Sequence, residues 1–381
     1  MRPLLLLLTL ALGSAACPAR DVFVYVGTFT NFNGRDTGSK GIYLGRLDLD
    51  TGKLGTFALT AEGANPSFLA LAPDHRHLYA TSEVAMTDGK PVGGVYAFSI
   101  NSANGGLQLL NRANAGGPGP THIAIDPSGR MAAVANYDNG SIATLPILSD
   151  AHVGEPATYI EHKGKSVDPK RQDHAYAHSV TFSPDGRFLF SDDLGTDKIY
   201  GYSVDAAHAA IGPLDPSWVA VKPGSGPRHL ALHPDGRHVY VVSEMASTVS
   251  VFTYNSAQGS FSEEPVQVIS TLPADFKGTS TGAEVAVHPS GRFLYTSNRG
   301  LDSIALFQID ATGRLTFVET VSTMGKTPRH FALDPSGHWL VAANQNSNSL
   351  VVFRVDPASG RLTAAGSTVE LPAPVCVLFA N

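Results

Sequence analysis

Cysteine is scarce in this 381-residue sequence, which contains only Cys17 and Cys376. Two cysteines are too few for a disulfide framework or for a structural zinc site. We expect Cys376 to be a small buried side chain, because unpaired cysteine is among the most buried residue types. The alternative is a single disulfide between Cys17 and Cys376, which would join the two ends of the chain in an oxidising compartment.

Basic clusters and long apolar runs are also missing. The chain has 27 Lys and Arg against 33 Asp and Glu, a formal net charge of -6, and no run of basic residues. Nucleic-acid partners are therefore excluded, because phosphate binding needs clustered Lys and Arg. No segment reaches the length of a transmembrane helix. The sequence also lacks a Gly-x-Ser-x-Gly motif, so it gives no sign of a serine nucleophile of that type.

The N-terminus has the layout of a secretory signal peptide over residues 1–16. A positive charge at Arg2 precedes the apolar run Leu4–Leu12, and small residues follow up to Ala16. The apolar run is too short to span a bilayer. We therefore expect an exported protein, periplasmic or extracellular. Cleavage after Ala16 would leave Cys17 at the new terminus, where it could carry a lipid anchor.

One sequence unit recurs along the chain. Each copy has two apolar segments joined by a short motif, most often Pro, then Asp or Ser, then Gly and Arg. Pro presets φ and Gly accepts a positive φ, so this motif is typical of a tight turn between antiparallel strands. The segments alternate with period two and are rich in Val, Ile, Phe and Tyr, which favours strands. The six turns start at Pro73, Pro127, Pro184, Pro234, Pro289 and Pro335.

The number of units predicts the fold. A third apolar strand follows each pair, and a Gly-containing turn often leads to a fourth, as at residues 312–315. Four short strands per unit are typical of a propeller blade. The chain ends supply a seventh blade, with Pro374–Ala380 as its first strand and Asp21–Thr28 as its second. We therefore expect an all-β fold, a single seven-bladed β-propeller over residues 17–381, rather than a helical solenoid or a doubly wound α/β fold.

Candidate functional residues gather at one level of the predicted ring. Positions just before first strands and just after second strands lie at the mouths of the central channel, and His, Arg and Glu recur there. Arginine binds carboxylate or phosphate and can stabilise a developing oxyanion, while Glu and His can transfer protons. This set suits the hydrolysis of a lactone without a cofactor. The leading candidates, expected to be catalytic, are His178, Arg228, Glu244 and Arg299, and the second-rank candidates, expected to bind the substrate, are His122, Asp193, His229 and Glu284.

A catalytic metal is not expected. His174 and His178 are four residues apart, but this spacing puts two histidines on one face only in a helix, and the segment reads as a loop that leads into a strand. That loop is the end of the longest polar insert, residues 161–176, which we place over one face of the ring. Long loops on a rigid scaffold are often functional.

Five segments carry a family resemblance that covers nearly the whole chain after residue 16. They are YVGTFT at Tyr25, HSVTFSPDGRFLF at His178, DDLGTDKIYGY at Asp192, GSGPRHLALHPDGRHVYVVSE at Gly224 and NRGLDSIALF at Asn298. These segments resemble the β-propeller lactonase family, which includes the propeller-type 6-phosphogluconolactonases and the carboxy-muconate cyclases. The resemblance implies a seven-bladed ring whose site lies in the channel.

The resemblance also implies roles for the four leading candidates, which match the family's site residues. Arg228 and Arg299 are expected to hold the substrate anion and the lactone oxygen, and Glu244 to act as the base. His178 is expected to assist proton transfer or to orient the substrate. Tyr176 departs from the family pattern, because relatives often carry a second histidine two positions before the first.

The expected activity is the hydrolysis of a small sugar lactone by a monomeric, metal-independent enzyme. Export argues for an unphosphorylated lactone, because phosphorylated sugar lactones are cytoplasmic metabolites. Two alternatives stay open, a muconate-lactonising cyclase and a non-catalytic exported propeller whose channel residues form structural ion pairs. Convergence of Arg228, Glu244 and Arg299 around an open pocket would favour the enzyme.

Overall fold

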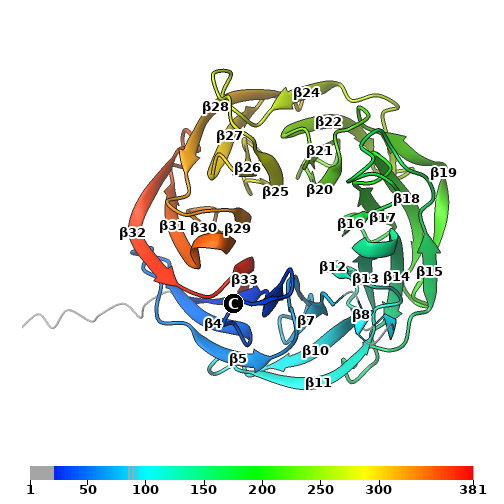
Figure 1. The fold of residues 1–381 in the computed structure, drawn as a ribbon, viewed down its shortest axis with the longest axis horizontal. Coiled ribbons are helices and arrows are strands. Elements are labelled where there is room, and N and C mark those ends of the chain that lie inside the picture. The colour runs from blue at the N-terminus through cyan, green and yellow to red at the C-terminus, as the bar shows by residue number, and fades with distance from the viewer. Residues whose placement is uncertain (1–20, 85, 88–89, 92, 381) are drawn as a thin grey trace, which may run out of the picture.

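A computed structural model describes residues 21–84, 86–87, 90–91 and 93–380, and within these residues the chain closes into a ring of seven antiparallel sheets (Figure 1). Each sheet is a blade whose first strand faces the ring axis and whose last strand lies at the rim. The seven-bladed all-β propeller expected from the repeat is confirmed. In the described part of the chain, no helix is long and apolar enough to cross a membrane.

The blades are numbered along the chain, and their strands are given from the axis outward. Blade 1 holds β33 (Pro374–Ala380), β1 (Asp21–Thr28), β4 (Gly41–Asp48) and β5 (Ala58–Glu62); blade 2 holds β6 (Leu69–Leu71), β7 (His77–Ser82), β10 (Gly94–Ile100) and β11 (Leu107–Asn114). Blade 3 holds β12 (Pro120–Ile125), β13 (Met131–Asn136), β14 (Ser141–Pro146) and β15 (Thr158–Glu161); blade 4 holds β16 (Ala177–Phe182), β17 (Phe188–Asp193), β18 (Lys198–Asp205) and β19 (Ala210–Ala220).

The remaining blades follow the same plan. Blade 5 holds β20 (Pro227–Leu232), β21 (His238–Ser243), β22 (Thr248–Asn255), β23 (Ser260–Phe261) and β24 (Gln267–Ser270); blade 6 holds β25 (Thr281–Val287), β26 (Phe293–Arg299), β27 (Ser303–Ile309) and β28 (Leu315–Ser322); blade 7 holds β29 (Pro328–Leu333), β30 (Trp339–Asn344), β31 (Ser349–Val355) and β32 (Leu362–Glu370). Outside the blades lie the hairpins β2 (Asn31–Phe32) with β3 (Arg35–Asp36) and β8 (Met86–Thr87) with β9 (Lys90–Pro91), and the short 3-10 helices η1 (Tyr137–Asn139) and η2 (Gln345–Ser347).

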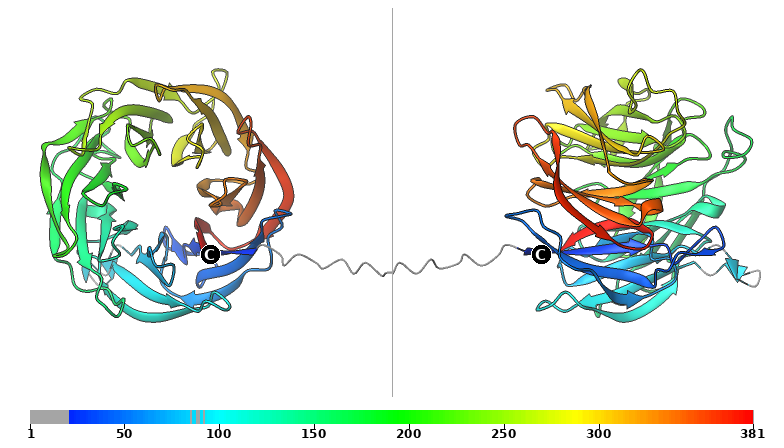
Figure 2. Two further views of the ribbon diagram at one scale, coloured as in Figure 1. Left: turned by 180° about the vertical axis from the view of Figure 1, so that it is seen from behind. Right: turned by 60° about the vertical axis from the view of Figure 1, so that its left-hand side comes forward.

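The two ends of the described chain close the ring, as expected. β33 pairs with β1 in antiparallel register, which places the last strand beside the first (Figure 2). This pairing removes the open sheet edges that a linear array of blades would present. Cys376 lies in β33 opposite Gly27, where it is buried and its thiol is free. Cys17, the signal peptide expected at residues 1–16 and the terminal disulfide lie outside the described residues.

The turns define two faces of the ring. The Pro-containing turns all join a first strand to a second strand on one face, which we call the turn face. At their glycine positions φ is positive, for example 71° at Gly129 and 67° at Gly236, and His75 adopts 57° where the first turn has no glycine. We call the opposite face, where second strands end and first strands begin, the site face. Asp21 and Ala380 both lie on the turn face, because β1 starts and β33 ends there.

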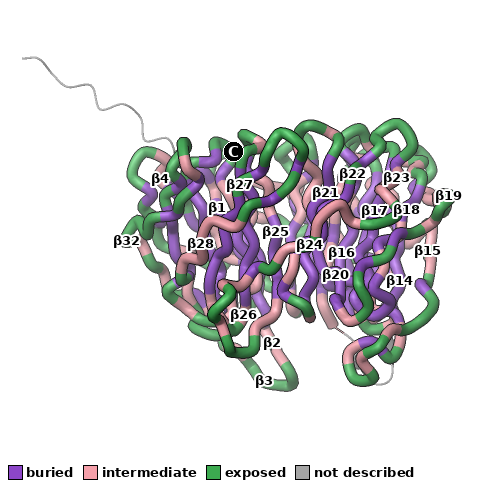
Figure 3. The backbone as a smooth tube through the Cα atoms, turned by 90° about the horizontal axis from the view of Figure 1, so that it is seen from above, coloured by how far each residue is buried: buried purple, intermediate pink, exposed green. Residues whose placement is uncertain are grey.

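The core lies between blades rather than inside any one of them. The cluster that contains Val24 and Leu47 of blade 1, for example, continues into Val341 and Val352 of blade 7, and each of these four side chains is fully buried. Equivalent clusters fill the other gaps between neighbouring blades. Exposed residues gather in the loops of the two faces, and the β2–β3 hairpin projects from the site face (Figure 3). Each blade therefore depends on both neighbours for its stability.

Buried tyrosines add a polar contact between neighbouring blades. The hydroxyl of Tyr240 in blade 5 donates to the carbonyl of Gly313 in blade 6 at 3.0 Å. Tyr25 and Tyr295 donate in the same way to a glycine carbonyl of the next blade, each at 2.6 Å. Burial raises the pKa of Tyr25 to about 12, which keeps this hydroxyl protonated. These tyrosines hold the outer turn of one blade to the second strand of the blade before it.

Replacing one of these tyrosines tests this contact. In Tyr240→Phe the Gly313 carbonyl stays buried without its donor, so the free energy of unfolding should fall by about 1–3 kcal/mol. Urea unfolding of the variant and the wild type measures the difference. Tyr159→Phe, at a tyrosine that is 46% exposed, is the matched control. Equal midpoints for Tyr240→Phe and the control would show that the contact adds no stability.

Candidate active site

The start of the innermost strand is irregular in several blades, and this irregularity shapes the channel. In blade 5 the pairing of the first two strands shifts by one residue between Pro227 and His229. Such a shift is a β-bulge, which redirects the extra residue, here Arg228. As a result, the consecutive side chains of Arg228 and His229 both line the central cavity. Equivalent bulges occur at Thr121, His178 and Arg329 in blades 3, 4 and 7.

Glu244 binds three arginines at the site face. Its Oε1 lies 2.6 Å from Nη2 of Arg171, and its Oε2 lies 2.8 Å from Nη2 of Arg299 and 3.3 Å from Nε of Arg228. Arg228 belongs to β20, Arg299 ends β26, and Arg171 comes from the polar insert. We call these four residues the Glu244 cluster. The structure thus brings together Arg228, Glu244 and Arg299, the convergence that favours an enzyme.

The arginines determine the protonation of Glu244. Burial alone would raise the pKa of this carboxyl, but Arg299, Arg228 and Arg171 lower it by more, and the pKa lies well below its usual value. A carboxylate with such a pKa stays ionised and is a weak proton acceptor. The three ion pairs favour a role for Glu244 in holding the arginines, and the base role that the resemblance implies stays a prediction.

His178 lies next to the Glu244 cluster. Its ring centre is 5.6 Å from that of Tyr137 and 5.2 Å from that of His229, and Nδ1 is buried with no hydrogen-bond partner among the described residues. Burial, and then the positive charge of Arg228, lowers the pKa of His178 well below its usual value. The imidazole is therefore neutral near pH 7. The lowered pKa makes His178 a weak base, as it does Glu244. The neutral imidazole nevertheless has an acceptor nitrogen that no described residue occupies, whereas arginines occupy both oxygens of Glu244, so His178 is the group that can accept from water.

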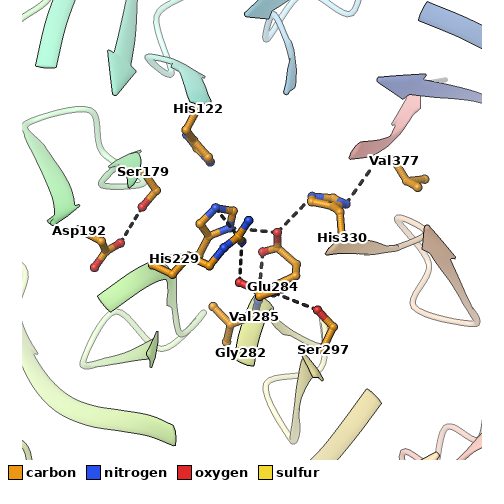
Figure 4. A network of polar contacts seen from close by, with 12 residues as sticks. His122, Ser179, Asp192, His229, Gly282, Glu284, Val285, Ser297, His330 and Val377 are labelled. Carbon is orange, nitrogen blue, oxygen red and sulfur yellow. Dashed lines mark hydrogen bonds and ion pairs between the residues drawn. The ribbon is translucent and has the colours of Figure 1, made fainter. Parts of the chain in front are cut away.

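One residue deeper in the channel, histidines from three blades surround a buried carboxylate (Figure 4). Nδ1 of His229 lies 3.0 Å from Oε2 of Glu284, and Nε2 of His330 lies 3.3 Å from the same oxygen. His122 lies beside them, with its ring centre 5.1 Å from that of His229. Burial lowers the pKa of all three histidines, to about 4 for His330. We call His122, His229, His330 and Glu284 the histidine layer.

The neighbours of His229 and His330 fix where their protons lie. An arginine only donates, so Nε2 of His229, 3.2 Å from Nη1 of Arg228, accepts, and the proton on Nδ1 is donated to Glu284. Nδ1 of His330 accepts from the backbone N–H of Val377 at 3.2 Å, which leaves the proton on Nε2 facing Glu284. Glu284 thus orients His229, and His229 orients Arg228. The arrangement supports a positioning role for both, whereas sequence analysis expected them to bind substrate.

Arg228 of the Glu244 cluster and His229 and His330 of the histidine layer line a small cavity, which we call the central cavity. It holds about 10 Å³, room for about one water. Arginines, histidines and hydroxyls face it, so it offers several hydrogen-bond donors to a small oxygen-rich ligand. Its lining residues are Ser67, Phe68, Glu83, Thr121, Arg228, His229, Arg329, His330 and Val375.

Asp193 lies outside both groups. Its Oδ1 accepts the backbone N–H of Tyr176 and of Thr196, and its Oδ2 lies 2.7 Å from Nδ1 of His162. The carboxylate is fully buried. These contacts use both oxygens and give Asp193 a structural role, because they tie the polar insert to blade 4. The substrate binding expected for Asp193 stays a prediction.

Sequence analysis did not select three charged residues that the structure brings into the channel. Arg171 comes from the polar insert, which runs without a strand from residue 162 to residue 176 across the site face, as expected. The path of the loop decides which of its side chains reaches the channel, and residue spacing in the sequence does not predict that path. Arg329 had a signal, because Pro328-Arg329-His330 repeats the triplet Pro-Arg-His that contains Arg228. Glu83 lies at the position in blade 2 that Glu244 occupies in blade 5.

Potential metal ligands also meet on the turn face. Among the described residues, His233, Asp235 and His238 form the one group of this kind, with ligand atoms within 4.8 Å of one another. Nε2 of His233 donates to the carbonyl of Gly291 at 2.7 Å, and Nδ1 of His238 lies 2.8 Å from Asp235. These contacts satisfy the side chains as part of a turn. The group lies at the opposite end of blade 5 from Glu244 and takes no part in the channel.

Comparison with known proteins agrees with this geometry. A family model described as "Lactonase, 7-bladed beta-propeller" matches residues 23–379. The chain belongs to this family of propeller lactonases. It is therefore a lactone-hydrolysing type of enzyme, and the resemblance seen in the sequence is confirmed.

Individual relatives cover nearly all of the chain. A 6-phosphogluconolactonase of Bacillus subtilis is 38% identical over 357 residues, which are 93% of this chain and 97% of the relative. A 6-phosphogluconolactonase of Formosa agariphila is 33% identical, over 81% of this chain and 85% of the relative. Among solved structures, the periplasmic gluconolactonase of Pseudomonas aeruginosa has a TM-score of 0.87 and 34% identity, covering 95% of this chain and 99% of its own.

The buried histidines make the stability of this lactonase depend on pH. In the unfolded chain histidine has a pKa of about 6.5, and in the fold burial lowers the pKa of His122, His178, His229 and His330. Below pH 6.5 the unfolded chain binds protons that the folded chain does not, so the free energy of unfolding falls as pH falls. Each histidine should contribute up to about 1.4 kcal/mol per pH unit, down to its own folded pKa.

Urea unfolding at several pH values from about 7.5 to about 5, a range that spans the pKa of unfolded histidine, measures this slope. His122→Phe should lower the slope by up to the contribution of one histidine. The phenylalanine keeps an aromatic ring against Phe68 but has no group that titrates. The exposed His208 provides the matched control, His208→Phe. An unchanged slope in His122→Phe would mean that His122 is not held neutral.

Proposed function

We propose that this propeller lactonase hydrolyses an unphosphorylated sugar lactone of the gluconolactone type outside the cytoplasm. The observation that carries the proposal is the Glu244 cluster, three arginines around one carboxylate beside the neutral His178 at a channel cavity. Preorganised donors in a water-poor site stabilise the oxyanion that forms when a lactone carbonyl is attacked. The family supplies the reaction class, and the site supplies groups suited to it.

The proposed reaction needs one proton acceptor and at least one oxyanion donor. Water attacks the lactone carbonyl carbon while His178 takes a proton from it, and Arg228 and Arg299 hold the carbonyl oxygen as it becomes negative. The ring C–O bond then breaks, and His178 returns the proton to the leaving oxygen. The products are a hydroxyl and a carboxylic acid, which ionises. Glu244 keeps the arginines in place and offsets their charge in the empty site.

The choice of an unphosphorylated substrate rests on the expected export. Similar proteins include 6-phosphogluconolactonases and a periplasmic gluconolactonase, so the family alone is compatible with either substrate. The signal-peptide layout of residues 1–16 points to a compartment without phosphorylated sugar lactones. Cys17 at the new terminus could carry a lipid. Asp21 lies on the turn face, so such an anchor would leave the site face open to the surroundings.

Activity measurements on defined variants test this function. Acid release from glucono-δ-lactone and from its 6-phosphate is followed against the spontaneous rate. His178→Asn should lower kcat by about 10²–10⁴-fold, the range for a lost general base. Arg228→Ala should lower kcat by about 10²–10³-fold, as for a lost oxyanion donor. Arg237→Ala, at an exposed arginine of the turn face, is the matched control.

Glu244→Gln separates the two roles considered for this residue. If Glu244 holds the arginines, the glutamine amide keeps the shape of the carboxylate, and the loss in kcat should be smaller than in His178→Asn. A larger loss in Glu244→Gln than in His178→Asn would return the base role to Glu244. If the wild type accelerates neither lactone, the lactonase proposal fails and a non-catalytic binding propeller becomes the better account.

Export is tested by the mass of the protein recovered from cells of a host with two membranes. Cleavage after Ala16 should give a periplasmic protein that begins at Cys17, with or without the added mass of a lipid. Leu7→Arg interrupts the apolar run and should leave the full-length chain in the cytoplasm. Wild-type protein found in the cytoplasm with its N-terminus intact would contradict export.

A further inference from the structure

A second and larger cavity opens on the site face, beside the central cavity. It holds about 600 Å³, and we call it the mouth cavity. This lies within the roughly 300–1,000 Å³ of typical small-molecule pockets. Glu83 lines both cavities, so the mouth cavity and the central cavity share a wall. The lining residues are Phe29, Thr30, Asn31, Phe32, Asn33, Gly34, Ala64, Asn65, Glu83, Val84, Gly119 and Asp138.

The charge of the mouth cavity opposes that of the Glu244 cluster. Its lining contains two carboxylates, Glu83 and Asp138, and no Lys or Arg. Burial, and to a smaller extent the nearby Asp138, raises the pKa of Glu83, while Arg329 lowers it. A phosphate or carboxylate group against this lining would meet like charge and no lining cation. The mouth cavity therefore suits an uncharged ligand.

Opposite charges that do not touch lie at the wall that the two cavities share. Among charged groups, Arg329 has the largest effect on the pKa of Glu83, and Glu83 has the largest effect on the pKa of Arg329. No ion pair within 4.0 Å joins these two described residues. Ser67 donates to one oxygen of Glu83, and Arg329 lies over the ring of Phe29 with no hydrogen-bonded partner among the described residues. A hydroxyl group between them can accept from the guanidinium and donate to the carboxylate. A phosphate group near neutral pH is mostly deprotonated and cannot donate a hydrogen bond to the carboxylate.

An aromatic surface forms another wall. Phe32 stacks on Phe29 with ring centres 5.0 Å apart, and Phe32 is only half-buried whereas Phe29 is 2% exposed. The side chain of Asn65 holds the hairpin that carries Phe32, since its Oδ1 accepts the backbone N–H of Thr30 and of Asn31, each at 2.9 Å. Its Nδ2 donates to the backbone carbonyl of Glu83 at 2.9 Å. The aromatic wall is thus fixed relative to the acidic one.

We propose that the mouth cavity is a subsite for an uncharged sugar unit attached to the lactone. Its ligand would be the second sugar of a disaccharide aldonolactone, with hydroxyls facing Glu83 and Asp138 and the C–H face of the ring on Phe32. The proposal rests on the proposed lactonase function, and it extends the substrate from a single sugar to a glycosylated one. Arg329 and Glu83 select hydroxyls at the junction of the two cavities.

The first test is a comparison of substrates. The kcat/KM of glucono-δ-lactone is compared with those of the lactones of maltobionic, cellobionic and lactobionic acid. At least one disaccharide lactone should exceed gluconolactone by about tenfold, the gain expected from one good aromatic contact. Phe32→Ala and Asp138→Asn should each remove about this gain, measured as the ratio of the two kcat/KM values. Leu148→Ala and Asp50→Asn, at exposed residues of the turn face, are the matched controls.

Binding of maltose and cellobiose, measured by calorimetry, reports on the subsite without any lactone chemistry. If a disaccharide binds and both Phe32→Ala and Asp138→Asn weaken this binding, the subsite is supported. This holds even if no lactone is hydrolysed, and only the proposed lactonase function then fails. The subsite is overturned if no disaccharide binds and no disaccharide lactone is preferred. A preference for the 6-phosphate of gluconolactone over every neutral lactone would overturn it as well.

Discussion

The channel of this protein depends on a β-bulge at the start of the innermost strand. A regular strand would turn alternate side chains away from the axis, and one of each consecutive pair would face a neighbouring blade. The bulge admits an extra residue, so Arg228 and His229 can both line the channel. Because the same device recurs around the ring, a structural repeat brings unlike side chains from several blades to one place. The blade-to-blade core holds these strands at fixed positions.

The channel contains two buried groups of side chains that differ in charge. The Glu244 cluster contains three arginines and one carboxylate, so it keeps an excess of positive charge where an oxyanion would form. The histidine layer is neutral apart from Glu284, whose Oε2 faces an N–H of His229 and of His330. Burial explains both features. It makes each charge costly unless paired, and it keeps the histidines unprotonated, so His178 is available as an acceptor.

The fold could be predicted from the sequence because its signals are local and repeated. Six Pro-containing turns at similar spacing give six blades, and the unmatched strands Asp21–Thr28 and Pro374–Ala380 give the seventh. The same regularity located Arg228, Glu244 and Arg299, which occupy equivalent levels in neighbouring blades. It did not indicate the contacts of Asp193 with the polar insert, since a position at the end of a strand does not tell whether the side chain turns to the channel or to the insert.

Other features of the site arise from contacts that no repeat encodes. Arg171 reaches Glu244 through the path of an irregular loop, and the low proton affinity of Glu244 follows only once all three arginines are in place. The most direct measurement of the central claim is a crystal structure with gluconate bound. The account predicts the gluconate carboxylate at the Glu244 cluster, hydrogen-bonded to Arg228 and within reach of His178. Gluconate bound away from the Glu244 cluster would contradict it.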